Sequence, residues 1–219
     1  MTAPCAPPAG LRRFLGGRPP RPERCGLCAA PVDAARHRHL VDTPRRALVC
    51  ACPDCFMPLA SPGADAGRFR AVPDRWLTDP HHRLDDRAWD ALRIPVGVAF
   101  FLRNTELDRL VALYPSPAGA TESELDPATW AAALGGSRLA GLLRPDVEAL
   151  LLRRTPDGCT CHLVPIDVCY ELVGRMRQSW RGFDGGAEAR AALDAFFTRA
   201  AERARPLPGP HENDKEPAG

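Results

Sequence analysis

The chain has 219 residues and a mass of 23.8 kDa, enough for one ordinary domain and a small additional module. Hydrophobic residues make up 45% and charged residues 26% with a net charge of +2, which excludes a disordered polyelectrolyte and a fibrous protein. The start lacks the apolar run of a secretory signal and no stretch is long enough to span a bilayer, so we expect a cytoplasmic protein without membrane insertion.

Composition divides the chain into four parts. We expect residues 1–22, rich in Pro, Gly and Arg, to be a disordered leader, and residues 205–219 to be a disordered tail. Residues 23–60 form a small module and residues 68–204 a larger domain, joined by a Gly- and Pro-containing linker. The first 60 residues carry nine Arg against four acidic residues, so the module is basic and the rest is mildly acidic.

The predicted elements of the module are two short strands, 39–42 and 47–50, that form a hairpin. The larger domain is predicted to begin with a short helix capped by Asp85 or Asp86, followed by strands at 96–102 and 110–114. Segment 114–123 is expected to be a loop, and a helix begins after Asp126 with Pro127 in its first turn.

A second predicted hairpin joins strands 147–153 and 159–166, and Asp167 is expected to cap the helix that follows, which includes Trp180. A last helix follows Gly185 and Gly186. The predicted fold class is therefore α+β: a small zinc-ribbon-like metal module, then an antiparallel sheet with helices packed on one face.

Two Cys-x-x-Cys pairs dominate the module. They are separated by 23 residues that contain the predicted hairpin, and each pair can bend around one ion. In a reducing compartment, clustered cysteines indicate a metal site more than a disulfide framework. We therefore predict that zinc is held by four thiolates, those of Cys25, Cys28, Cys52 and Cys55.

The module contains more ligands than one ion needs. His37, His39 and Cys50 lie in the same segment, and Cys50 and Cys52 alternate along one predicted strand, so their side chains should face the same way. These three residues are therefore alternative ligands, or ligands of a second ion. Iron in a rubredoxin-like site is the alternative to zinc, since Cys52-Pro-Asp-Cys55 partly matches a rubredoxin knuckle.

Three further cysteines lie in the larger domain. Cys159 and Cys161 start a predicted strand, and Cys169 lies near the start of the next helix, where the helix dipole would lower its pKa. No second knuckle accompanies them, so we predict that they fill space between sheet and helix. No set of residues forms a recognisable catalytic constellation, and the sequence does not identify an enzyme.

Several segments together resemble an uncharacterised actinobacterial family encoded in gene clusters for high-affinity, oxygen-tolerant NiFe hydrogenases. The segments are ERCGLC, HRHLVD, CACPDC, IPVGVAFFL, ALYPSPAGATES and VPIDVCYELVGRMRQSWRGF, and the likeness covers residues 23–200. The resemblance implies an accessory or assembly role that acts through protein–protein interaction with hydrogenase subunits or maturation factors. It implies no reaction.

Three functions remain open at this stage. The first is a metal-binding assembly protein with structural zinc, the second an iron redox protein of rubredoxin type, and the third a zinc-ribbon regulator that binds nucleic acid through the basic module. The sequence favours the first, because candidate catalytic groups are few and the larger domain is mildly acidic, and the module offers few aromatic side chains for stacking on bases.

Overall fold

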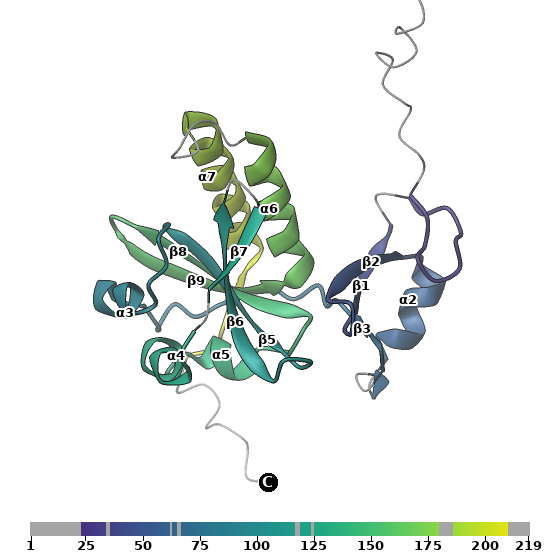
Figure 1. Cartoon of the computed structure of the whole chain (residues 1–219), viewed down its shortest axis with the longest axis horizontal. Helices are drawn as coiled ribbons and strands as arrows, with labels where there is room; N and C mark the ends of the chain where they lie inside the picture. Colours follow the sequence, from purple (N-terminus) through teal and green to yellow (C-terminus); the bar gives the residue numbers. More distant parts are fainter. Residues whose placement is uncertain are drawn as a thin grey trace, which may run out of the picture.

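The computed structural model describes residues 23–33, 36–61, 63–64, 67–116, 119–123, 125–179 and 186–209. These residues form a small unit and a larger body that lie side by side (Figure 1). The predicted leader, residues 210–219 of the predicted tail and Trp180 lie outside the described residues. Within the described part, no helix is both long and apolar enough to cross a membrane.

The small unit is a three-stranded antiparallel sheet with one helix. Strands β1 (Arg38–Asp42) and β2 (Ala47–Ala51) form the predicted hairpin, helix α2 (Pro53–Leu59) follows, and β3 (Phe69–Ala71) pairs with the other side of β1. Side chains alternate between the two faces of this sheet. Leu40 and Val49 pack near α2, whereas Val41 and Leu48 join the core of the body. The unit thus has an outer and a body-facing side.

The body contains a seven-stranded sheet in the order β10-β4-β9-β8-β5-β6-β7. Its neighbouring strands are antiparallel except for β10 and β4, which are parallel. The strands are β4 (Leu77–Thr78), β5 (Val98–Asn104), β6 (Arg109–Ser116), β7 (Gly119–Ser123), β8 (Glu148–Thr155), β9 (Gly158–Pro165) and β10 (Arg205–Pro206). Both predicted hairpins are present, as β5–β6 and β8–β9.

Helices cover both faces of this sheet. Phe100 and Leu151 face helices α6 (Ile166–Ser179) and α7 (Gly186–Arg203), together with part of the small unit. Phe101 and Leu150 face the opposite side, where α3 (Asp86–Ala91), α4 (Pro127–Leu134) and α5 (Arg138–Leu142) pack. The prediction that helices cover only one face is therefore wrong. Successive apolar residues of the central strands point to opposite faces, so each face of the sheet has its own hydrophobic core.

Local capping signals place two of the helices. The Asp85 carboxylate accepts a hydrogen bond from the Ala88 N–H at 2.7 Å, and the Asp126 carboxylate accepts one from the Thr129 N–H at 3.0 Å. Asp167 does not cap a helix as predicted. Helix α6 already begins at Ile166, so Asp167 lies in its first turn and is free to contact the small unit.

Four short strands of the described residues were not predicted, namely β3, β4, β7 and β10. The segment expected to be a loop after Tyr114 contains β7, which pairs with β6 at the sheet edge. Arg205 and Pro206, placed in the tail by the sequence, form β10, and the Leu207 N–H donates to the Thr78 carbonyl at 2.8 Å. The body therefore extends beyond residue 204.

Candidate metal centre

The first pair of cysteines lies on a tight turn before β1. The Ala29 N–H donates to the Cys25 carbonyl at 2.8 Å, and Ala29 has a left-handed φ of 61°. The Gly26 N–H donates to the Cys50 carbonyl at 2.8 Å, which fastens this turn to β2. The turn therefore holds Cys28 beside the end of the hairpin.

The second pair lies at the start of α2. Cys52 is the residue before the helix, with extended backbone angles, and Pro53 occupies the first helical turn, where its missing N–H is not needed. Cys55 follows within the same turn. Strand β2 ends at Ala51 and the chain immediately enters α2. Both sulfurs of this second pair therefore lie near the turn that carries Cys25 and Cys28.

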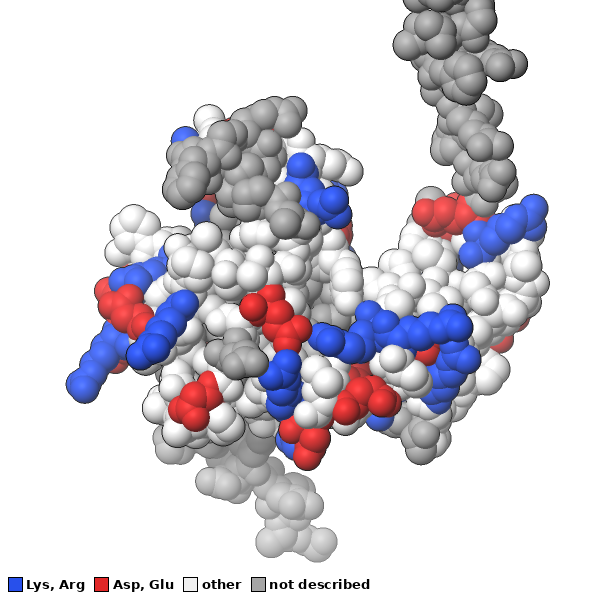
Figure 2. All heavy atoms as spheres, in the orientation of Figure 1, with Lys and Arg blue, Asp and Glu red and all other residues white. Residues whose placement is uncertain are grey.

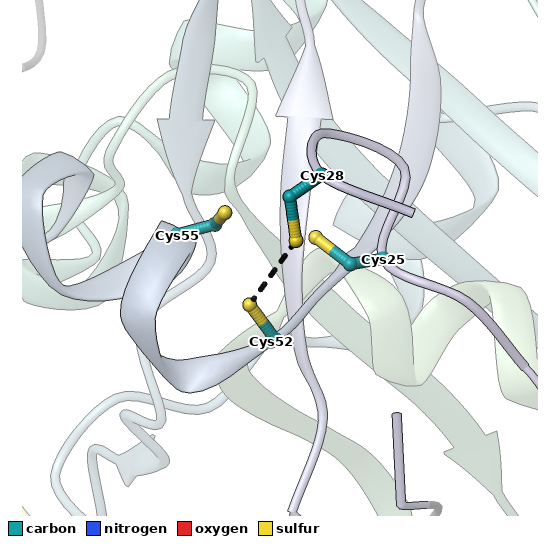
Figure 3. Close-up of side chains that lie close together, drawn as sticks. All are labelled: Cys25, Cys28, Cys52 and Cys55. Carbon is teal, nitrogen blue, oxygen red and sulfur yellow. Dashed lines mark hydrogen bonds between the residues drawn. The ribbon is translucent and has the colours of Figure 1, made fainter. Parts of the chain in front are cut away.

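The four sulfur atoms of Cys25, Cys28, Cys52 and Cys55 lie within 4.8 Å of one another (Figure 3). The Cys28 and Cys52 sulfurs are 3.7 Å apart. Tetrahedral zinc with Zn–S bonds of about 2.3 Å requires S–S separations of about 3.8 Å. All four cysteines are free thiols. Their arrangement fits one metal ion, so the cluster can hold a metal.

Hydrogen bonds between the sulfurs and nearby groups perturb these thiols strongly. Burial opposes the ionisation of Cys25, but N–H groups of Cys28, Cys52 and Leu27 donate to its sulfur and lower its pKa to about 6. Hydrogen bonding to the sulfurs of Cys28 and Cys52 raises the pKa of Cys55 to about 12. The cluster thus shares protons unequally, and a bound cation would be needed to bring all four sulfurs to the thiolate form.

The three surplus ligands form a separate group. One ligand atom each from His37, His39 and Cys50 lies within 4.8 Å of the others. His39 is directly opposite Cys50 in the β1–β2 ladder. Cys50 shares the body-facing side of β2 with Leu48, so the expectation that it faces the same way as Cys52 is wrong.

Asp167 contacts His39 of this second group, although the sequence predicted that it caps a helix. Its Oδ2 lies 2.7 Å from His39 Nδ1, across the junction of small unit and body. Arg70 of β3 bonds Asp146 at 2.7 Å across the same junction. A contact between residues so far apart in sequence has no local signal, so sequence reasoning could not find it.

The other three cysteines do not form a metal site in the described part of the chain. Cys159 and Cys161 pack with the core beneath α3 and α4, whereas Cys169 is buried in the core beneath α6 and α7. Burial raises the pKa of Cys159 to about 11 and raises that of Cys169 strongly, so the expected lowering by the helix dipole is overridden. Their space-filling role agrees with the prediction.

A cavity of about 490 Å³ lies between the β1–β2 hairpin and the body. Its floor is apolar, with Leu102, Leu113 and Val173, and Arg45 and Arg177 lie at its wall. Basic and acidic side chains are interspersed on the face shown in Figure 2, so this face carries no continuous basic surface. The junction therefore offers an apolar hollow bordered by arginines.

These features define a two-part α+β protein whose small unit carries a four-cysteine cluster able to hold a metal ion. The chain belongs to DUF5947, a family of unknown function, whose model matches residues 24–204. No curated protein and no solved structure matches the chain significantly.

Proposed function

We propose that this protein is a metal-binding accessory factor in which Cys25, Cys28, Cys52 and Cys55 hold a structural zinc ion. The observation that carries the proposal is the clustering of four sulfurs with a spacing suited to tetrahedral zinc. The zinc-organised unit and the body together present a docking surface for a protein client.

The size of the core in the small unit supports a structural metal. Its buried cluster consists of Cys25, Leu40 and Ala51, with other apolar side chains only partly covered. So little buried apolar surface cannot hold a fold without further support. The order of knuckle, hairpin and helix bearing the second cysteine pair is that of treble-clef zinc modules. This order favours zinc over the iron of a rubredoxin-like redox protein.

Elemental analysis of freshly purified protein tests the metal. We expect a colourless protein that contains zinc, and a red protein that contains iron would replace this proposal by the redox function. Cys52→Ser should release the metal and unfold the small unit. Cys161→Ser is the matched control, because Cys161 lies in the body core, and it should retain the wild-type metal content. Equal metal loss in both variants would refute the assignment.

The junction cavity supports docking of an acidic client segment with an apolar anchor. Leu102, Leu113 and Val173 can cover an apolar side chain, and Arg177 at the wall can complement a carboxylate. A nucleic-acid client is less well supported, because Arg46 is paired with Glu122 at 3.3 Å and Arg45 lies 3.8 Å from Asp42.

We further propose that the client is a NiFe hydrogenase subunit or maturation factor, on the strength of the resemblance in segments such as CACPDC and VPIDVCYELVGRMRQSWRGF. Affinity purification of the tagged full chain from a host that makes such a hydrogenase tests this. A hydrogenase or maturation protein should be recovered with wild type and lost with Arg177→Glu.

The control for the client experiment is Arg87→Glu, an equally large charge change on α3, outside the cavity wall. This variant should recover the same client as wild type. Recovery of no hydrogenase or maturation protein would remove the client proposal. Equal recovery by Arg177→Glu and wild type would remove the cavity as the docking surface.

A further inference from the structure

The group formed by His37, His39 and Cys50 lies on the body-facing side of the small sheet. Strand alternation separates it from the outer side, where Val49 and Ala51 pack with Cys25. The two groups therefore share no ligand, although Cys50 and Cys52 are close in sequence. An ion in one group leaves the ligands of the other available.

Asp167 orients His39 for metal binding. An ionised carboxylate can only accept a hydrogen bond, so the 2.7 Å contact makes His39 Nδ1 the donor. Nε2 of His39 then carries the lone pair and is available to a metal. Metal-binding histidines commonly donate their second ring nitrogen to a carboxylate in this way.

Two buried atoms in this group lack a hydrogen-bond partner in the described structure. They are His37 Nδ1 and Asp167 Oδ1. Leaving a buried polar atom unpaired is unfavourable, so such atoms indicate a missing partner. For a ring nitrogen that lies beside a second imidazole and a thiol, a metal ion is a chemically suitable partner.

We propose that His37, His39 and Cys50 form a second metal site, for a divalent transition-metal ion of borderline softness such as Zn²⁺ or Co²⁺. Two imidazole nitrogens and one thiolate suit this class of ion, whereas Mg²⁺ and Ca²⁺ require oxygen ligands. Three protein ligands leave a fourth position for an exchangeable ligand, unlike the closed four-cysteine site.

The surroundings of this second site permit exchange. His37, His39 and Asp167 line a cavity of about 420 Å³ between the small unit, α6 and α7. The ring centroids of His37 and His39 are 4.8 Å apart, and both residues are only partly buried. A water molecule or a donor atom of a client can therefore reach an ion held here, which makes this the site where the protein would exchange or present metal.

Metal titration of the full chain tests the second site. Metal-free protein is titrated with Zn²⁺ in competition with a chromogenic chelator, and with Co²⁺ by visible absorption. Wild type should bind two equivalents, and His37→Gln and Cys50→Ser should each bind one. The equivalent that remains in both variants should show the thiolate-to-cobalt absorption of a four-cysteine site, and circular dichroism should match wild type.

Asp167→Asn tests the positioning of His39. Removal of the charge should weaken the second equivalent by about 10- to 100-fold without changing the stoichiometry. Glu171→Gln is the control, since Glu171 lines the same cavity on the same helix but does not contact His39. It should leave both affinities unchanged.

Wild type that binds a single equivalent retained by His37→Gln would overturn the second site and leave the proposed four-cysteine site intact. Two equivalents in both His37→Gln and Cys50→Ser would also overturn it. In contrast, a single equivalent that His37→Gln abolishes would support this site and remove the four-cysteine site instead.

Discussion

Gly26→Ala should weaken metal binding at the four-cysteine site, because the first knuckle has no room for a methyl group. A Cβ at Gly26 would lie 2.4 Å from Val49 Cγ1, whereas ordinary carbon–carbon contacts are about 3.5–4.0 Å. The knuckle cannot simply move away, since the Gly26 N–H is bonded to the Cys50 carbonyl at 2.8 Å. The overlap therefore exceeds an ångström at a point fastened to β2.

Overpacking of this kind destabilises by about 1–3 kcal/mol. Under the proposed structural role of zinc, folding of the small unit is coupled to metal binding, so this energy should appear as a loss of zinc affinity of roughly 5- to 150-fold, at about 1.4 kcal/mol for each factor of ten. Competition with a chelator measures the affinity. Gly136→Ala is the control, since no heavy atom lies within 4 Å of a Cβ there.

Val49→Ala provides a compensating change, because it removes the methyl group that collides with the new side chain. In the double variant Gly26→Ala/Val49→Ala, the loss of zinc-binding free energy should be smaller than the sum of the losses in the two single variants. Unchanged affinity in Gly26→Ala would refute the close approach of knuckle and strand. Strict additivity in the double variant would show that any loss arises elsewhere.

Two further predictions concern stability. Ala29→Gly should stabilise the zinc-loaded protein by roughly 1 kcal/mol in thermal unfolding, because a left-handed φ of 61° strains alanine but not glycine, and an unchanged or lower midpoint would contradict this. Arg75→Met should destabilise by about 3–5 kcal/mol in urea unfolding, since it leaves the fully buried Glu148 carboxylate without the arginine bonds at 2.8 and 2.6 Å. Arg75→Met/Glu148→Met should recover most of this loss, and a double variant as unstable as the single one would refute the pairing argument.

The parts of the fold that could be predicted from sequence depend on local signals. Asp85 and Asp126 cap helices through bonds to residues three positions later, and the three predicted hairpins join strands that are neighbours in sequence. Strand β7 escaped prediction because Gly-Ala-Thr-Glu-Ser has little intrinsic strand preference and is extended through its pairing with β6.

The coverage of both sheet faces had a signal that the prediction did not use. Strands β5 and β8 contain unbroken apolar runs, Val98–Leu102 and Ala149–Leu152, where a sheet with one solvated face would alternate with polar residues. Such runs indicate strands that are buried on both sides.

At the site, spacing identified the four clustered cysteines but assigned Cys50 to the wrong side. The error came from extending the strand to Cys52, whereas β2 ends at Ala51 and the chain enters α2. The role of Asp167 depends on a contact with His39 that only the tertiary fold creates. Ligand type can thus be predicted from sequence more readily than the grouping of ligands.

The second proposed site depends on the four-cysteine site, but the four-cysteine site does not depend on the second. Cys50 and His39 face each other because β1 and β2 are paired, and this hairpin belongs to the unit with the small buried core that we propose zinc stabilises. On these proposals, an ion at the four cysteines would assemble the second site, whereas an ion at the second site would not be needed to assemble the first. Cys52→Ser should accordingly lose both equivalents, and His37→Gln only one. Metal would first complete the fold and then occupy the exchangeable position that faces the body.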